Sequence, residues 1–336
     1  MPAAITACLI NLLIAPALVC TISETADRSL VRRAARHEAT SKTDLRDQSG
    51  ERRLENAVES TVATERSLSL SKVFTAAAAE MDNNATKHFF GSFKICGRCD
   101  SFKRFGETND GGYLMCMDSL KPGTIKAAYS LGVRDHDQWS VDVAADLEVP
   151  VNQFDCTVQK TANQCKGCWF FKKCIVSADG KHPVADGWGL QQALSETGQG
   201  SATAGSLLMK MDIEGSEWPV FASARLQVLK KFNQLIVEFH NLEDEGKHGE
   251  YLQAMQRILS SGLKVAHLHG NNCVNNIGPE SNKMYRFGDF SIPKIVEVTF
   301  VRADARANGC LDNQVYDALD APNGGSNPEL PMAHLR

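Results

Sequence analysis

Two acidic residues follow a mostly apolar run in the middle of the chain, and their spacing could support chemistry. The run Leu207–Met211 is followed by Asp212, Glu214 and Gly215, and an amphipathic pattern starts directly afterwards. A buried parallel strand that turns into a helix has this pattern, and its last side chains reach the carboxyl edge of the sheet, where open α/β sheets bind ligands. We therefore predict that Asp212 and Glu214 belong to a functional site. The alternative is that Asp212 caps the following helix and Glu214 is only solvated.

A histidine ends the next apolar run, Leu235–His240. Transfer of a group to a hydroxyl needs a positioned base, and imidazole titrates near neutral pH. We predict that His240 is this base, with Asp212 and Glu214 beside it; the alternative is a histidine that orients the loop or binds a backbone carbonyl. The same three side chains could instead hold a divalent metal, but their spacing names no metal, and a site without metal is predicted. Further polar residues at the later strand ends are Asn241, His269, Asn271 and Asn272.

Three predicted strand ends form a candidate cofactor site. The first ends at Ser130-Leu131-Gly132, the second ends in Asp155 roughly twenty residues later, and the third ends in Asp212. A glycine allows a ligand to approach the backbone, and an acid at the position of Asp155 binds ribose hydroxyls in nucleotide folds. The chain has neither Gly-x-Gly-x-x-Gly nor Gly-x-x-x-x-Gly-Lys, which disfavours a dinucleotide or a triphosphate. S-adenosylmethionine, with one ribose and no phosphate, is the predicted cofactor, bound by Ser130, Gly132, Asp155 and Asp212.

The elements around these residues predict a Rossmann-like α/β fold. Strands that alternate with helices imply right-handed crossovers and a mostly parallel sheet. The loop from Gly270 to Pro293 contains no helical pattern, so the last two strands are expected to be antiparallel. The predicted strands are Ala127–Val133, Val149–Asp155, Phe170–Val176, Leu207–Asp212, Leu235–His240, Val265–His269 and Ile295–Val301. The predicted helices are Gln138–Leu147, Leu190–Thr197, Ser216–Lys231 and a helix that includes Tyr251–Leu259.

Several blocks in this order resemble the FkbM-like, methyltransferase-like group of class I S-adenosylmethionine-dependent methyltransferases. The blocks are Asp110–Tyr113, Tyr129–Val133, Gln153–Thr157, Met209–Trp218, Ile236–His240 and Ile295–Phe300. The resemblance covers about Phe89 to Arg302, and Lys210–Glu217 is its most specific part. It implies a Rossmann-like sheet with an antiparallel final strand, and methyl transfer, usually to oxygen. One departure is Ser130–Asp135, which has fewer glycines than the loop usual in the family.

Composition and charge narrow the classes of function. Of the 336 residues, 43% are hydrophobic and 23% are charged, as in ordinary globular proteins. The formal net charge is −4, and no basic stripe is interleaved with aromatic residues. Binding to nucleic acid is therefore not expected, and the function must come from a site.

The ends of the chain differ from its centre. Residues 1–20 carry no charge and are predicted to be a signal peptide, or alternatively an uncleaved anchor, the one case in which membrane contact is expected. Residues 21–88 are predicted to be a disordered or helical leader, since most of this stretch mixes charges and lacks aromatic residues. A methyltransferase-like domain is expected over residues 89–302 and a loop-rich tail over 303–336. The predicted location is secreted or in the endomembrane lumen.

Nine of the 11 cysteines lie after residue 20. In an oxidising compartment they are expected to form disulfides with one thiol left over. The alternative is a four-thiolate zinc site built from Cys96, Cys99, Cys165 and Cys168.

Two function classes follow. The first is a methyltransferase that transfers a methyl group to a hydroxyl or carboxyl of a small molecule or glycan. The second is a secreted binding protein or effector that keeps the fold without catalysis, which the glycine-poor first loop would suit. Calorimetric titration with S-adenosylmethionine separates them.

Overall fold

The computed structural model describes residues 84–161, 165–180, 184, 186–273, 284–302, 304, 309–311, 318–324 and 328–330. All of them belong to the unit Lys72–Arg336. The predicted signal peptide and the predicted leader up to residue 83 lie outside the described residues. In the described part of the chain, no helix is long and apolar enough to cross a membrane.

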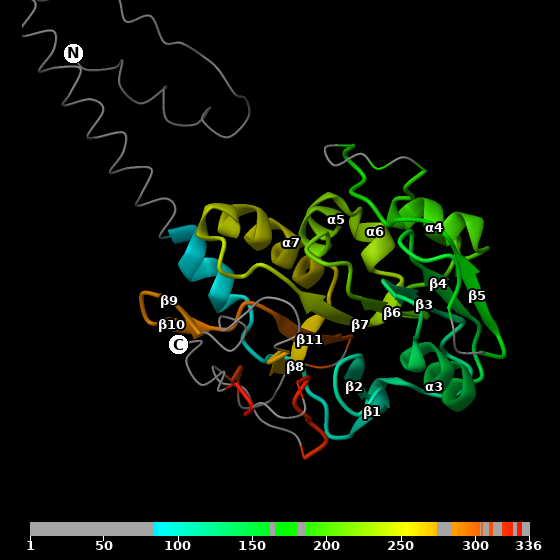
Figure 1. The fold of residues 1–336 in the computed structure, drawn as a ribbon, viewed down its shortest axis with the longest axis horizontal. Coiled ribbons are helices and arrows are strands. Elements are labelled where there is room, and N and C mark those ends of the chain that lie inside the picture. The colour runs from blue at the N-terminus through cyan, green and yellow to red at the C-terminus, as the bar shows by residue number, and fades with distance from the viewer. Residues whose placement is uncertain are drawn as a thin grey trace, which may run out of the picture. The chain divides into compact units, whose positions relative to one another are not determined.

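One sheet of seven strands organises the domain, in the order β5-β4-β3-β6-β7-β11-β8. The strands are β3 (Ala127–Leu131), β4 (Val151–Phe154), β5 (Cys168–Phe171), β6 (Leu207–Met211), β7 (Phe232–Phe239), β8 (Lys264–Gly270) and β11 (Val296–Val301). The strands from β5 to β7 are parallel, and β11 runs antiparallel between β7 and β8. This is the predicted Rossmann-like class I methyltransferase sheet, mostly parallel with an antiparallel final strand (Figure 1).

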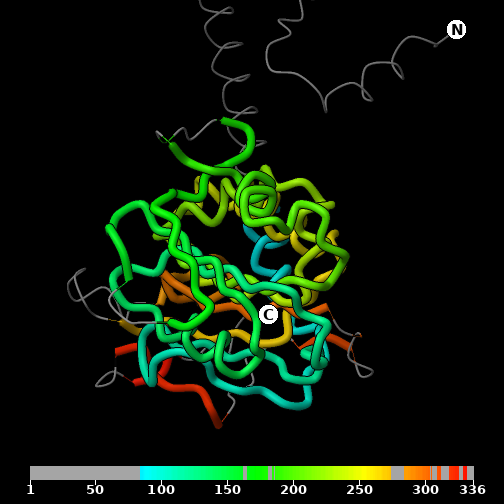
Figure 2. Tube along the Cα trace, turned by 90° about the vertical axis from the view of Figure 1, so that its right-hand side faces the viewer, coloured from blue at the N-terminus to red at the C-terminus, as the bar shows by residue number. Residues whose placement is uncertain are grey.

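Helices cover both faces of the sheet. One face carries α4 (Leu190–Glu196), α5 (Glu217–Ser223), α6 (Leu226–Leu229) and α7 (His248–Ser260). The other carries α3 (Gln138–Leu147) and the hairpin of β1 (Phe102–Gly106) and β2 (Gly112–Cys116). Figure 2, turned by 90°, shows the sheet between these two layers. The smaller elements are η1 (Met117–Ser119), η2 (Glu245–Lys247), β9 (Tyr285–Phe287) and β10 (Phe290–Ile292).

Most predicted elements differ from the observed ones by one to three residues at an end, and two differ more. The predicted helix Ser216–Lys231 is split into α5 and α6, because Ser223 Oγ bonds back to the carbonyls of Pro219 and Val220 and Ala224 is extended (ψ 138°). The predicted strand Phe170–Val176 is also misplaced, since β5 starts at Cys168 and a turn after Phe171 ends it. In that turn the N–H of Lys173 donates to the carbonyl of Phe171.

The alternation along β6 and β7 decides which side chains meet. Leu207, Met209 and Met211 pack in the core beneath α4–α7, whereas Leu208 packs on the opposite face, beneath α3 and the hairpin. Since side chains alternate in a strand, Lys210 lies on the face of Leu208. In β7, Glu238 likewise lies on the face of Ile236, which packs with Leu208. Polar side chains from both strands therefore gather on the hairpin side.

Four disulfides link eight of the described cysteines. They are Cys96–Cys310, Cys99–Cys116, Cys156–Cys174 and Cys165–Cys168. Cys273 is unpaired. The prediction of disulfides with one thiol left over is confirmed, and the four-thiolate zinc interpretation is wrong, because Cys96 and Cys99 bond to partners outside the proposed set.

Candidate functional site

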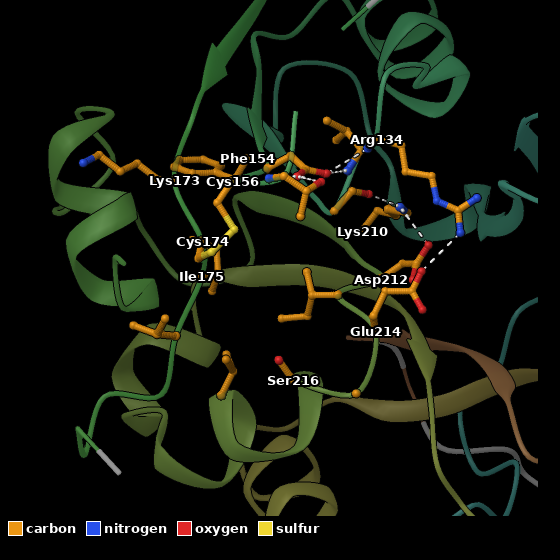
Figure 3. Close-up of a pocket in the computed structure, with 18 of the residues that line it drawn as sticks. Arg134, Phe154, Cys156, Lys173, Cys174, Ile175, Lys210, Asp212, Glu214 and Ser216 are labelled. Carbon is orange, nitrogen blue, oxygen red and sulfur yellow. Dashed lines mark hydrogen bonds and ion pairs between the residues drawn. A yellow bond between two sulfur atoms is a disulfide. The ribbon is translucent and has the colours of Figure 1, made fainter. Parts of the chain in front are cut away.

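A cleft of about 810 Å³ lies where β3, β4 and β6 end. The loops that follow these strands contribute Gly132–Asp137, Asp155–Thr157 and Asp212–Ser216 to its lining. Figure 3 shows Arg134, Lys210, Asp212 and Glu214 on one side of the cleft. Phe154, Ile175 and the disulfide Cys156–Cys174 lie on the other side (Figure 3). The predicted ligand edge of the sheet is therefore hollowed, with charged side chains on one wall and apolar groups together with Lys173 on the other.

Asp212 directs its carboxylate toward a group of polar side chains. Its Oδ2 lies 3.6 Å from Lys210 Nζ and accepts from Tyr113 Oη at 3.5 Å, and its Oδ1 lies 3.8 Å from His240 Nε2. Lys210 also donates to the carbonyl of Gly132 at 2.7 Å, which ties the ends of β3 and β6 together. The side chain of Asp212 is 21% exposed, so a ligand in the cleft can reach it.

The helix-cap alternative for Asp212 is wrong. The N-cap residue of α5 is Ser216, and its side chain makes no capping hydrogen bond. The N–H groups of Ile213 and Gly215 instead donate to the carboxylate of Glu217, which is fully buried. Glu217 thus stabilises the turn that follows β6, whereas Asp212 lines the cleft.

Glu214 is exposed and also close to the polar group. Its backbone has φ +58°, its side chain is 66% exposed, and it pairs with Arg134 at 3.1 Å. Its Oε2 lies 3.6 Å from His240 Nε2. The side chain of Glu214 is therefore largely solvated, as the alternative held. It also lies close to His240, as predicted.

His240 is buried among carboxylates. Its Nδ1 lies 3.3 Å from Glu217 Oε1. Burial alone would lower the pKa of His240, but the hydrogen bond and charge of Glu217 and the charges of Glu238 and Asp212 raise it to about 10. An imidazole with this pKa carries a proton at neutral pH and cannot accept another, so Asp212 is the better candidate for the base.

Gly132 has positive φ (+77°), and a Cβ there would lie 1.6 Å from the carbonyl oxygen of Asp212. Glycine is therefore required at this position because the end of β6 approaches its backbone closely. Gly132 also lines the cleft. Ser130 is fully buried, and the described residues that line the cleft do not include it. Sequence reasoning placed Ser130 correctly at a strand end but could not show which way its side chain points.

The carboxylate of Asp155 accepts hydrogen bonds from the loops that follow β3 and β4. Its Oδ2 accepts from the N–H groups of Val133 and Arg134, and its Oδ1 accepts from the N–H and hydroxyl of Thr157, at 2.6–3.0 Å. Burial would raise the pKa of Asp155, but these hydrogen bonds lower it. A carboxylate offers about four lone-pair positions, and all of them are used here. Asp155 shapes the cleft, and a ribose hydroxyl would have to share its oxygens with the loop.

Three buried residues of the site were missed as functional candidates: Tyr113, Glu217 and Glu238. Tyr113 Oη donates to Glu238 Oε2 at 3.1 Å, and Asn271 Nδ2 donates to Glu238 Oε1 at 2.8 Å. Burial, followed by the charge of Asp212, raises the pKa of Glu238 well above its ordinary value. A glutamate inside the apolar run Leu235–Phe239 was the available signal, since a buried carboxyl needs partners.

The remaining polar residues at the strand ends have separate roles. Asn241 lines the cleft. Asn272 binds the carbonyl of Pro328 and the N–H of Gly324, and His269 lies between Glu297 and Glu329. Asn272 and His269 thus hold the described C-terminal residues against the domain.

Comparisons with known proteins give fold-level likenesses. No family model matches the chain, and no curated protein matches it. A Listeria monocytogenes protein assigned as an S-adenosylmethionine dependent methyltransferase is similar with a TM-score of 0.32 and 10% identity, over 56% of this chain and 96% of that chain. M. jannaschii TYW2, solved in complex with AdoMet, is similar with a TM-score of 0.25 and 8% identity, over 62% of this chain and 89% of that chain.

Proposed function

We propose that this chain is an S-adenosylmethionine-dependent methyltransferase that acts on oxygen, in a hydroxyl or carboxyl of a small molecule or glycan. The observation that carries the proposal is the meeting of β3, β4 and β6 at one cleft, with the carboxylate of Asp212 partly exposed in it. In open α/β sheets this edge is where ligands bind.

The cleft suits a nucleoside-containing cofactor. Its volume of about 810 Å³ lies within the range usual for small-molecule sites. The cleft has an apolar wall on which the adenine ring of the cofactor can lie, formed by Ile175, Val176 and Ile213. Ser177 lines the same cleft, and its buried hydroxyl has no hydrogen-bond partner among the described residues. A ligand that bonds this hydroxyl would satisfy it.

Asp155 contributes to this binding through the backbone. Because its carboxylate fixes the N–H groups of Val133 and Arg134, it sets the shape of the loop after β3. Gly132 and Asp212 complete the same wall, where their backbones are in contact. Cofactor binding by Gly132, Asp155 and Asp212 is therefore proposed as a property of one preformed surface.

When bound, S-adenosylmethionine would supply an electrophilic methyl group to the acceptor oxygen, and its sulfur would keep the electron pair of the broken C–S bond. For a hydroxyl acceptor, the proton passes to the carboxylate of Asp212. Lys210 and protonated His240 hold this carboxylate in place from two sides. A carboxylate acceptor needs no base, and for it the same residues serve to position the substrate.

The location proposed for the protein is secreted or endomembrane lumen. The four disulfides are consistent with an oxidising compartment.

The test measures methyl transfer and melting temperature on the same samples of wild type, Asp212→Asn and Asp135→Asn. Release of S-adenosylhomocysteine is followed over a panel of phenols, sugars and uronic acids. With a hydroxyl acceptor, Asp212→Asn should lower turnover by ~10²–10⁴-fold while the fold survives. Asp135 lines the same cleft and serves as the matched control. Full turnover in Asp212→Asn would place the base elsewhere, and cofactor binding without transfer to any acceptor would favour a binding protein.

A further inference from the structure

Three side chains at the ends of β6 and β7 converge in the manner of metal ligands. Asp212, Glu238 and His240 each offer one ligand atom, and these atoms lie within 4.8 Å of one another. His240 Nε2 is 3.8 Å from Asp212 Oδ1 and 3.6 Å from Glu238 Oε1. Both separations are longer than a hydrogen bond. They are close to the ~3.4 Å expected between two donors that bind one tetrahedral ion at about 2.1 Å.

We propose that Asp212, Glu238 and His240 form a binding site for a divalent transition-metal ion, with Glu214 as a further ligand. Glu214 Oε2 lies 3.6 Å from His240 Nε2, on the side that opens to the cleft. A site of one imidazole and several carboxylates suits ions such as Mn²⁺ and Zn²⁺. Ca²⁺, in contrast, prefers oxygen ligands alone.

The imidazole is the independent observation that points to a ligand, and an ion bound at Nε2 would displace the proton that His240 carries in the metal-free chain. The side chain of His240 is only 8% exposed, and its Nε2 is directed among three carboxylates without a hydrogen bond to any of them. On the other side of the ring, Nδ1 faces Glu217 Oε1 at 3.3 Å. A histidine that binds metal through one nitrogen usually turns the other toward a carboxylate, and Glu217 has this position.

The carboxylate ligands are also held from outside. Tyr113 binds Oε2 of Glu238, and Asn271 binds Oε1. Lys210 lies beside Oδ2 of Asp212, which leaves Oδ1 toward His240. Such outer partners orient ligands in protein metal sites. The described residues therefore provide both the ligands and their supports.

The balance of charge favours a cation here. Asp110, Asp212, Glu238 and Glu297 lie close enough for their charges to act on one another. A divalent ion at this place would interact favourably with these carboxylates.

The metal site does not depend on methyl transfer, because the chain supplies the named ligands. The first experiment titrates the chelator-treated full chain with Mn²⁺, without S-adenosylmethionine, and follows free Mn²⁺ by electron paramagnetic resonance. We expect one ion per chain. Glu238→Gln and His240→Ala should each weaken binding by at least about tenfold. The control is Glu107→Gln, since Glu107 also lines the cleft but pairs with His136. This variant should bind Mn²⁺ as tightly as wild type does.

A measurement on wild type removes dependence on the folding of the variants. Pulsed electron paramagnetic resonance of the bound Mn²⁺ should show coupling to the ¹⁴N of one imidazole. Absence of stoichiometric binding, bound Mn²⁺ without nitrogen coupling, or wild-type affinity in a folded Glu238→Gln chain would overturn the metal site. A separate titration of the metal-free chain with S-adenosylmethionine tests the proposed function, so the two failures are distinguishable.

Discussion

Replacement of Gly132 by alanine tests how the first loop of the site is built. The carbonyl oxygen of Asp212 lies 1.6 Å from the place of a Cβ at Gly132, so no methyl group fits unless the backbone moves. Gly123 is a matched control, because it has φ +75° against +77° for Gly132 but nothing within 4 Å of its Cβ position. The two substitutions therefore differ in the backbone contact.

The magnitudes can be worked out from the contacts. Positive φ costs an alanine about 1–2 kcal/mol at either position. At Gly132 the shift also strains two hydrogen bonds, from Asp212 N to the carbonyl of Leu131 at 2.9 Å and from Lys210 Nζ to the carbonyl of Gly132 at 2.7 Å. With about 1–3 kcal/mol for each bond that is lost, Gly132→Ala should be less stable than Gly123→Ala by roughly 2–6 kcal/mol.

The assay is urea unfolding of the oxidised full chain, followed by tryptophan fluorescence and circular dichroism. We expect Gly123→Ala to lose only the ~1–2 kcal/mol that positive φ costs, and Gly132→Ala to unfold at much lower urea concentration than Gly123→Ala, both without any ligand. Equal stability of the two variants would refute the close contact between the ends of β3 and β6. The glycine would then be explained by cofactor approach, as the sequence predicted.

Three further predictions concern other parts of the structure. Asp155→Ala should destabilise the fold by about 2–3 kcal/mol in urea unfolding, because the loop N–H groups lose a charged acceptor, whereas Asp135→Ala should have little effect; equal effects would contradict this role for Asp155. Serine pairs at Cys96 and Cys310, which close a separation of 214 residues, should cost about 5 kcal/mol, against ~1–2 kcal/mol at Cys165 and Cys168, which are 3 apart; the reverse order would refute the pairing. Burial lowers the pKa of His269, but the hydrogen bond and charge of Glu297, with Asp320 and Glu329, raise it from 6.5 to about 9. Its stabilisation should be complete below pH 6.5 and fade as the pH rises through 9, so the stability difference between wild type and His269→Gln should shrink by up to about 3 kcal/mol over this window; a constant difference in pH-dependent unfolding would contradict the pairing.

The sheet was predictable because its strands are short apolar runs bounded by turns. The bounds of α3 agree with the prediction at both ends, since Asp137 caps the helix and its apolar positions are spaced for one face. The carboxyl ends of β3, β4 and β6 meet as expected, so Asp155 and Asp212 were placed at the right edge. Local pattern therefore sufficed for the fold and for placing these two acids at one edge of the sheet.

The chemistry of individual side chains was less accessible, because it depends on contacts far apart in the chain. The charge of His240 depends on Glu217 and Glu238, and the partners of Glu238 come from Tyr113 and Asn271. Asp155 matched the ribose-binding position by spacing alone, and only the structure shows that its oxygens serve the adjoining loops. The disulfide Cys96–Cys310 joins residues that no local pattern connects.

The central claim is that the cleft at the ends of β3, β4 and β6 binds S-adenosylmethionine. Hydrogen–deuterium exchange of the full chain, with and without this cofactor, tests both binding and its place. We predict slower exchange in residues 132–138, 155–157, 174–177 and 213–216, which line the cleft. No change in exchange at saturating cofactor, or protection confined to other segments, would contradict the account.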